Sequence, residues 1–242
     1  MKKLILICSV VLVCGLLGAN STYTIGSGTS TTSYAPINGS TSNGWSKMIY
    51  LKNELNSAGL YSGYIHGIAF NVAEYNGSKP INYIINNVKI YIRETTSTSY
   101  NSSGENFPSL SNPVFSGSLV INGSGWMEIG FSSPFNWGGT NNIEVLCKFD
   151  DGTWYYGYPY FYYTSTANNT CVYKYSSSSS SYSTRNRPNI QFAVVNSVPN
   201  PANYVYPANN GYAFTVGDSL TWVSGGGFPN KFDVYFGTSS NP

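Results

Sequence analysis

The sequence predicts an all-β fold, an antiparallel two-sheet β-sandwich, and three observations support this. Apolar and polar residues alternate in short runs, which is the period of a strand with one buried face. Gly, Asn, Pro and Ser bound these runs, and such residues are typical of turns. Only 9% of the 242 residues are charged whereas 16% are aromatic, and this aromatic content favours a packed, β-rich core over disorder.

The first element in chain order is a secretory signal over residues 1–19. Two lysines form its basic start, an apolar stretch runs from Leu4 to Leu17, and Leu17–Ala19 offers a small-residue cleavage site. The apolar stretch is shorter than the roughly 20 residues that a transmembrane helix needs. We therefore expect no transmembrane segment and a protein that is secreted or held at the bacterial cell surface. In the alternative, a lipoprotein, Cys14 would be the lipidated residue.

Signal removal also sets the charge of the mature chain. Loss of Lys2 and Lys3 lowers the twelve basic residues to ten, which equals the ten acidic residues. Nucleic-acid binding depends on clusters of Lys and Arg, and this sequence has no such cluster. We expect no nucleic-acid partner.

The sandwich domain is expected over residues 20–196, with about eight to ten strands, enough for two sheets around one core. Four runs show the clearest alternation: 66–72, 88–92, 127–131 and 190–194. One helix is expected at Leu51–Gly59, with Gly59 as its C-cap. The polar stretch Thr95–Pro113 is expected to be a long loop.

A second β-module is expected to follow a Pro-containing linker at 197–202, where proline disfavours continued sheet pairing. Residues 203–242 contain the strand-like runs Ser219–Val223, with a buried Trp222, and Lys231–Gly237. Two or three short strands do not bury a core by themselves. We therefore expect the first strands of an incomplete immunoglobulin- or fibronectin type III-like module, in a fragment of a longer protein.

Segments across nearly all of Tyr23 to Val195 resemble a domain of exported Bacteroidetes-type surface proteins. The segments are Tyr23–Thr31, Lys47–Leu51, Glu54–Gly59, Val88–Thr96, Gly125–Trp126, Pro134–Gly139 and Asn142–Val145. The resemblance implies a jelly-roll-like β-sandwich in large secreted proteins, which often carry a C-terminal type IX sorting domain. This sequence contains no such sorting domain. Leu220–Trp222 and Asp233–Thr238 resemble a fibronectin type III module, which implies a spacer or binding scaffold with no catalytic residues.

The sequence offers little for catalysis, so we do not expect this segment to be an enzyme, and we expect no cofactor. His66 is the single histidine, and alternation puts it on one strand face with Ile68, Phe70 and Val72, which favours a structural role. A Ser/His/Asp triad has no supporting motif. A glycosidase needs two carboxylates at a set spacing, and no pair stands out. Glu128 and Glu144 are expected to be solvated on polar strand faces.

Two pairs of residues leave alternatives open. Cys147 and Cys171 remain after signal cleavage, and they either form one disulfide or stay as two buried thiols. Asp150 and Asp151, followed by Gly152, form an ordinary hairpin turn or supply part of a calcium site.

The strongest binding signal is the aromatic run Trp154–Tyr163. Alternation puts four tyrosines on one side of a strand: Tyr156, Tyr158, Tyr160 and Tyr162. Aromatic rings with polar tips suit sugar or protein recognition; alternatively, Pro159 breaks the alternation and both sets cover core. Trp126 and Trp137 are expected to anchor the core and turns.

The function expected from the sequence is a non-catalytic module in adhesion, display or spacing. The alternative is a carbohydrate-binding module that uses strand 154–163. The expected partners are a glycan or another surface protein, together with other domains of the parent chain.

Overall fold

The computed structural model divides the chain into two compact units, Ser21–Val194 and the residues on either side of it. The described residues are 21–74, 83–102, 105–152, 159–175 and 180–195, together with the backbone at 203–206 and 221–223. In the second unit, β14 (Asn203–Tyr206) pairs antiparallel with β15 (Thr221–Val223). The expected strand at 219–223 is thus confirmed at its last three residues, while the run at 231–237 and the side chain of Trp222 lie outside the described residues.

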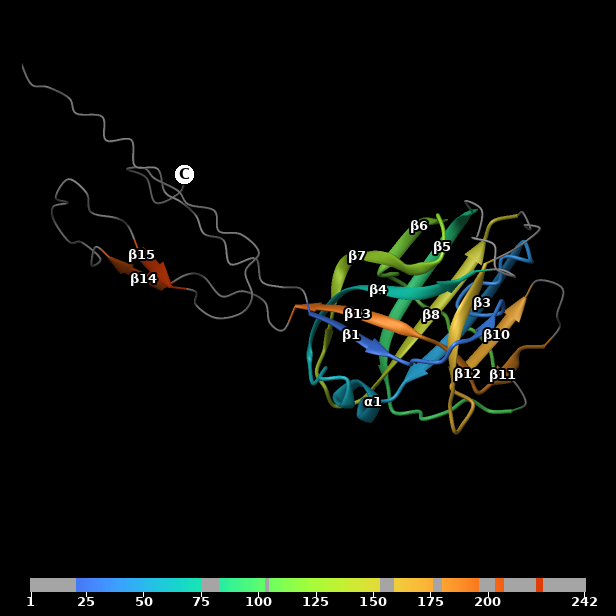
Figure 1. Cartoon of the computed structure of the whole chain (residues 1–242), viewed down its shortest axis with the longest axis horizontal. Helices are drawn as coiled ribbons and strands as arrows, with labels where there is room; N and C mark the ends of the chain where they lie inside the picture. Colours follow the sequence, from blue (N-terminus) through green and yellow to red (C-terminus); the bar gives the residue numbers. More distant parts are fainter. Residues whose placement is uncertain are drawn as a thin grey trace, which may run out of the picture. The chain divides into compact units, whose positions relative to one another are not determined.

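Eight strands form the skeleton of the first unit, in two sheets (Figure 1). The first sheet has the order β1-β13-β4-β7, and the second contains β3-β8-β5-β6. The strands are β1 (Ser21–Ile25), β3 (Asn43–Tyr50), β4 (Gly63–Ala73), β5 (Tyr83–Thr95), β6 (Phe115–Ile121), β7 (Gly125–Trp137), β8 (Asn142–Asp150) and β13 (Ile190–Val195). This order is that of a jelly roll, in which the chain passes back and forth between two sheets. The predicted all-β, two-sheet sandwich is confirmed.

Further strands extend both sheets beyond this skeleton. Four of them lie in the connection between β8 and β13, and the fifth lies between β1 and β3: β9 (Tyr160–Ser165), β10 (Cys171–Tyr175), β11 (Tyr182–Thr184), β12 (Asn186–Pro188) and β2 (Ser30–Thr32). In the first sheet β9 pairs with β4, β12 and β2, and in the second β10 pairs with β3 and β11. The first unit therefore has more strands than the eight to ten expected, because the shortest ones show no clear alternation.

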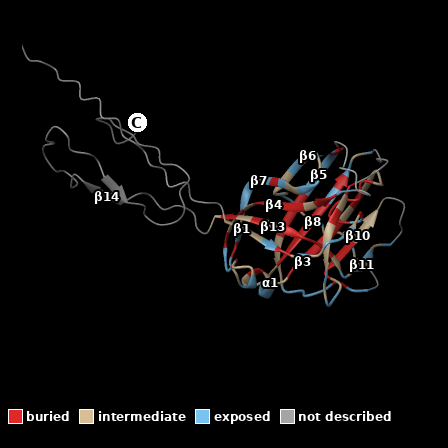
Figure 2. Cartoon of the chain, in the orientation of Figure 1, coloured by how far each residue is buried: buried red, intermediate tan, exposed pale blue. Residues whose placement is uncertain are grey.

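The core lies between the two sheets, where buried residues follow the predicted period of two (Figure 2). Ile68, Phe70 and Val72 of β4 are at most 2% exposed and face into this cluster. Residues of the second sheet, including Val145 and Phe149, meet them there. Full burial of one such side chain contributes about 1.5–3 kcal/mol, so this cluster is the main source of stability.

The expectation that His66 lies on the same strand face as Ile68, Phe70 and Val72 is wrong. The register between β4 and β7 shifts between Ile65 and Gly67, which is a β-bulge. A bulge exchanges the faces of the residues on either side of it. Ile65 therefore enters the core at 0% exposure, and His66 is only half-buried.

The predicted helix is confirmed as α1 (Lys52–Ser57), near β1 at one end of the sandwich (Figure 1). The Glu54 carboxylate accepts a hydrogen bond from the Leu51 backbone N–H at 2.9 Å, which caps the helix start. Gly59 ends it with a φ of +94°, a conformation that favours glycine. No helix in the described part of the chain has the length and apolar character needed to cross a membrane.

The described residues between β5 and β6 form the predicted long loop, and this loop covers the outer face of the second sheet. Tyr100 packs there against Ile49 and Val172. The Tyr100 hydroxyl donates a hydrogen bond of 2.8 Å to Glu144, which also pairs with Arg93. Glu144 is 2% exposed, so the expectation of a solvated carboxylate is wrong.

Candidate functional site

The predicted tyrosine stripe lies partly on β9. Phe161 is fully buried in the core, and alternation therefore turns its neighbours Tyr160 and Tyr162 to the outer face of the first sheet. Both tyrosines are half-buried. Tyr156 and Tyr158 lie outside the described residues.

Strand register places Asn71 and Trp126 beside Tyr162 on the same outer face. Val72 pairs with Phe161 on one side of β4, and Asn71 pairs with Trp126 on the other. Met127 packs against the core, so its neighbour Trp126 points outward. Trp126, Asn71 and Tyr162 thus form a row across three strands, here named the outer row. The expectation that Trp126 anchors the core is wrong, whereas Trp137 is fully buried and donates its indole N–H to the Asn141 carbonyl at 3.1 Å.

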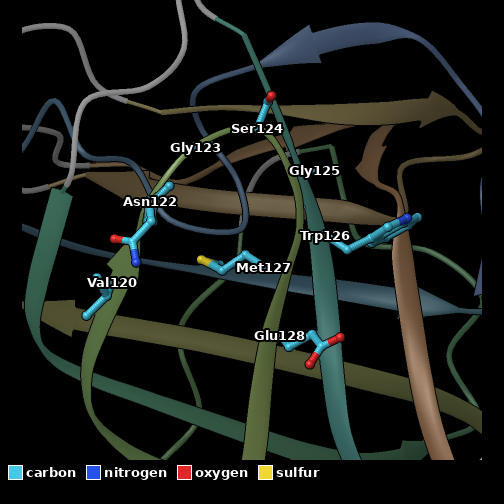
Figure 3. Close-up of a pocket in the computed structure, with 9 residues that line it drawn as sticks. Val120, Asn122, Gly123, Ser124, Gly125, Trp126, Met127 and Glu128 are labelled. Carbon is cyan, nitrogen blue, oxygen red and sulfur yellow. The ribbon is translucent and has the colours of Figure 1, made fainter.

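A hollow of about 290 Å³ lies beside the outer row, at the turn between β6 and β7. Figure 3 shows Trp126 and Met127 on opposite sides of β7, with Glu128 on the Trp126 side. The lining combines apolar surface with polar groups: Val120, Ile121, Asn122, Gly123, Ser124, Gly125, Trp126, Met127 and Glu128. An aromatic ring beside amide, hydroxyl and carboxylate groups is suited to a polar ligand with a flat apolar face.

A second aromatic set, not expected from the sequence, lies on β10, β11 and the segment after β2. It consists of Tyr34, Tyr173, Tyr175 and Tyr182, and we name it the tyrosine stack. Tyr34 stacks on Tyr173 with ring centroids 4.8 Å apart and planes 3° apart. Tyr182 lies 5.7 Å from both Tyr173 and Tyr175. Tyr34 follows a strand of the first sheet and Tyr173 belongs to the second, so the stack links the two sheets.

Two members of the tyrosine stack, Tyr173 and Tyr175, are uncharged at physiological pH. Burial raises the pKa of Tyr173 to about 12, with a further increase from the neighbouring phenols and the Cys171 thiol. A side-chain hydrogen bond with Tyr182 raises the pKa of Tyr175. Both phenols therefore remain protonated and keep their hydroxyls as hydrogen-bond donors.

Cys147 and Cys171 are free, buried thiols on the two strands that flank β3. Cys147 pairs with Ser46 and Cys171 with Met48. Strands separated by one intervening strand lie about 9–10 Å apart, whereas a disulfide needs Cα atoms within about 7 Å. This arrangement favours the alternative of two thiols.

We predict that neither thiol reacts with iodoacetamide in the folded protein. Burial raises the pKa of Cys171 to about 12 and raises that of Cys147 as well, and only the thiolate is reactive. In the mature chain without residues 1–19, mass spectrometry should show no adduct before unfolding, and two after unfolding in guanidinium without reductant. An unfolded chain that takes up no label would contradict this prediction and show a disulfide.

Asp150 and Asp151 lie at the end of β8, beside Gly152, which has a φ of +74°. The backbone N–H groups of Asp151 and Gly152 both donate to the Ser42 carbonyl, at 2.9 and 3.0 Å. Among the described residues no group of three or more His, Cys, Asp or Glu side chains gathers as metal ligands would. The calcium site stays a prediction, because the residues that follow Gly152 lie outside the described part.

Three glutamates of the described residues, one buried and two partly exposed, sit in ion pairs. Glu54 accepts two hydrogen bonds from Arg187, at 2.7 and 2.8 Å, and Glu144 pairs with Arg93. Glu105 accepts a hydrogen bond of 2.8 Å from the buried Lys47, whose ammonium lies 4.8 Å from the centre of the Tyr100 ring. A general acid needs a carboxyl group with a raised pKa, whereas Arg187 holds the pKa of Glu54 below its ordinary value despite burial.

Comparison with family models, curated proteins and solved structures found no match for this chain.

Proposed function

We propose that residues 20–196 form a non-catalytic recognition module of a secreted or cell-surface bacterial protein, in adhesion, display or spacing. One observation supports this most: aromatic side chains outside the core gather on the strands added between β8 and β13. Long connections on a rigid scaffold are common places for binding residues. The eight-strand skeleton supplies such a scaffold, and the added strands extend it in both sheets.

The export part of the proposal rests on the secretory signal at 1–19 and on the resemblance to type IX-exported surface proteins. The non-catalytic part rests on the ion pairs of Glu54, Glu105 and Glu144. We propose further that residues 203–242 begin a fibronectin type III-like spacer in a multidomain chain.

The proposal predicts binding without turnover. The whole chain should be incubated with soluble xylan, β-glucan and mannan, and both bound protein and released reducing ends should be measured. Retention without new reducing ends is the expected result. Release that stops on replacing Glu128 by glutamine would show an enzyme and contradict the proposal.

Carbohydrate binding is the second candidate function, and the outer row favours it. Trp126 and Tyr162 flank the Asn71 amide across three strands, so two ring faces border a side chain that both donates and accepts hydrogen bonds. Sugar rings present the complementary surfaces, because they combine a flat C–H face with an edge of hydroxyls.

We expect Trp126→Ala and Tyr162→Ala each to weaken polysaccharide retention by about fivefold, through loss of aromatic contact area. Affinity electrophoresis of the whole chain in gels containing each polysaccharide measures this. Tyr61→Ala is the matched control, because Tyr61 is 68% exposed and lies outside both aromatic sets. Equal retention of all three variants and the parent chain would exclude the outer row as the site.

A further inference from the structure

We infer that the tyrosine stack is a separate binding site for neutral sugar rings. This inference rests on the proposed role in recognition, but it uses none of the residues of the outer row. Four observations support it: the geometry of the rings, their exposure, the absence of charge within the stack and the polar residues around it.

The rings are nearly parallel, as a stacking surface requires. The planes of Tyr34 and Tyr173 differ by 3°, and those of Tyr175 and Tyr182 by 9°. Tyr173 and Tyr182, which face each other across the β10–β11 register, differ by 25°. Aromatic side chains in a protein core more often meet at an angle, as Tyr50 and Phe192 do at 87°.

Two members of the stack remain accessible. Tyr34 is 47% exposed and Tyr182 is 43% exposed. Contiguous exposed aromatic surface is typical of interaction sites, and these two rings contribute such surface to the stack.

The position of the stack on β10 explains this exposure. Cys171 is fully buried, and Tyr173 and Tyr175 follow it at intervals of two on the same strand face. The series therefore begins in the core and continues outward to partly exposed rings. Tyr34 and Tyr182 then extend the surface from neighbouring segments, so the site depends on the folded arrangement of three segments.

The surroundings of the stack favour an uncharged, hydroxyl-rich ligand. The stack presents phenol hydroxyls, and Thr184 shares the strand face of Tyr182 on β11. A nucleic acid, whose bases also stack on tyrosines, needs lysine or arginine contacts to its phosphates. Lys174 is the nearest cation along β10, and alternation turns it to the opposite strand face. A neutral pyranose, with a flat C–H face and hydroxyl edge, matches the stack in both shape and charge.

Affinity electrophoresis of the whole chain in xylan, β-glucan and mannan tests this assignment. We expect Tyr34→Ala and Tyr182→Ala each to weaken binding of at least one polysaccharide by about fivefold, while Tyr61→Ala leaves it unchanged. Tyr34→Phe should retain binding, because it keeps the ring. Loss of binding only in Trp126→Ala and Tyr162→Ala would overturn the tyrosine stack but support carbohydrate binding by the outer row. Absence of binding to all three polysaccharides would overturn both sites.

Chemical protection tests the same site in the unaltered chain, in case an alanine variant does not fold. Tetranitromethane nitrates accessible tyrosines, and peptide mapping locates the products. We expect a saturating polysaccharide to lower nitration of Tyr34 and Tyr182 about fivefold or more, because a bound sugar ring would cover their exposed surfaces. Tyr61 should be nitrated equally with and without polysaccharide. Unchanged nitration of Tyr34 and Tyr182 under conditions where the polysaccharide binds would place the ligand elsewhere.

Discussion

Replacing Arg187 by alanine is expected to lower the free energy of unfolding by about 3–5 kcal/mol, because it removes a large buried side chain together with its ion pair to Glu54, which is 31% exposed. Arg187 is 1% exposed. Its guanidinium donates to both carboxylate oxygens of Glu54 and to the Ile49 carbonyl, and it lies 4.5 Å from the centre of the Tyr50 ring. The substitution leaves a cavity and removes the Arg187 donor from three acceptor oxygens, of which one Glu54 oxygen keeps the Leu51 N–H. Chemical denaturation of the parent and variant chains measures the loss.

Arg93→Ala provides the matched control. Here the arginine is the exposed partner, at 43%, and Glu144 is the buried one, at 3%. Removing Arg93 leaves no buried cavity, and Glu144 keeps the Tyr100 hydroxyl as a donor. The loss for Arg93→Ala should therefore be clearly smaller than that for Arg187→Ala. If both variants lost the same free energy of unfolding, the burial of Arg187 would not determine its contribution to stability.

The contribution of the Arg187–Glu54 pair also depends on pH. Burial by itself raises the pKa of Glu54, but hydrogen bonds and charge from Arg187, with the Leu51 N–H, bring it below its ordinary value of 4.5. A lowered pKa in the folded state stabilises the protein above pH 4.5, and this stabilisation is lost as the pH falls through the folded-state value. The stability difference between parent and Arg187→Ala should therefore shrink as the pH decreases from 7 towards 3. If the stability difference did not change with pH, the Arg187–Glu54 interaction would not depend on a charged carboxylate, which would contradict this prediction.

Replacing Phe161 by alanine should also cost about 3–5 kcal/mol, the usual loss for a buried phenylalanine. Phe161 is fully buried and pairs with Val72 at the point where β9 joins β4. Thermal and chemical unfolding of the whole chain measure the effect. Because Phe161 helps to attach the added strands to the skeleton, its loss should also expose β9 to proteolysis.

Tyr162→Ala is the control for Phe161→Ala, since it removes an aromatic ring from the next position on the same strand. Tyr162 is only half-buried on the outer face, so the expected loss is about 1 kcal/mol or less. A larger loss for Tyr162 than for Phe161 would mean that β9 is shifted by one residue, which exchanges its two faces.

The sequence predicted the sheet architecture well because a strand with one buried face has a simple period. Ile68, Phe70 and Val72 face the core as expected, and so do Ile190, Phe192 and Val194. The position of His66 could not be predicted, because the bulge beside it depends on the partner strand β7. The burial of Glu144 depends in the same way on Tyr100, which lies on a distant loop.

The candidate sites show the same limit of prediction from sequence. Tyr160 and Tyr162 belong to a conspicuous aromatic run, so a binding surface was expected there. The tyrosine stack joins Tyr34 to Tyr173 and Tyr182, which are far apart in the chain and meet only through the pairing of β2, β9, β10 and β11. The spacing of Tyr173 and Tyr175 was the one available signal, and it indicates a shared strand face without locating Tyr34 or Tyr182.

The jelly-roll order needs none of the strands between β8 and β13, yet most of the half-buried tyrosines among the described residues lie on those strands. Phe161 and Cys171 attach this connection to the core, one in each sheet. The outward positions of β9, β10 and β11 can therefore vary while the eight-strand skeleton and these two anchors stay constant. Such a division suits a scaffold for selecting new binding specificities, in which a library would randomise the half-buried and exposed positions of β9, β10 and β11 and leave their buried positions fixed.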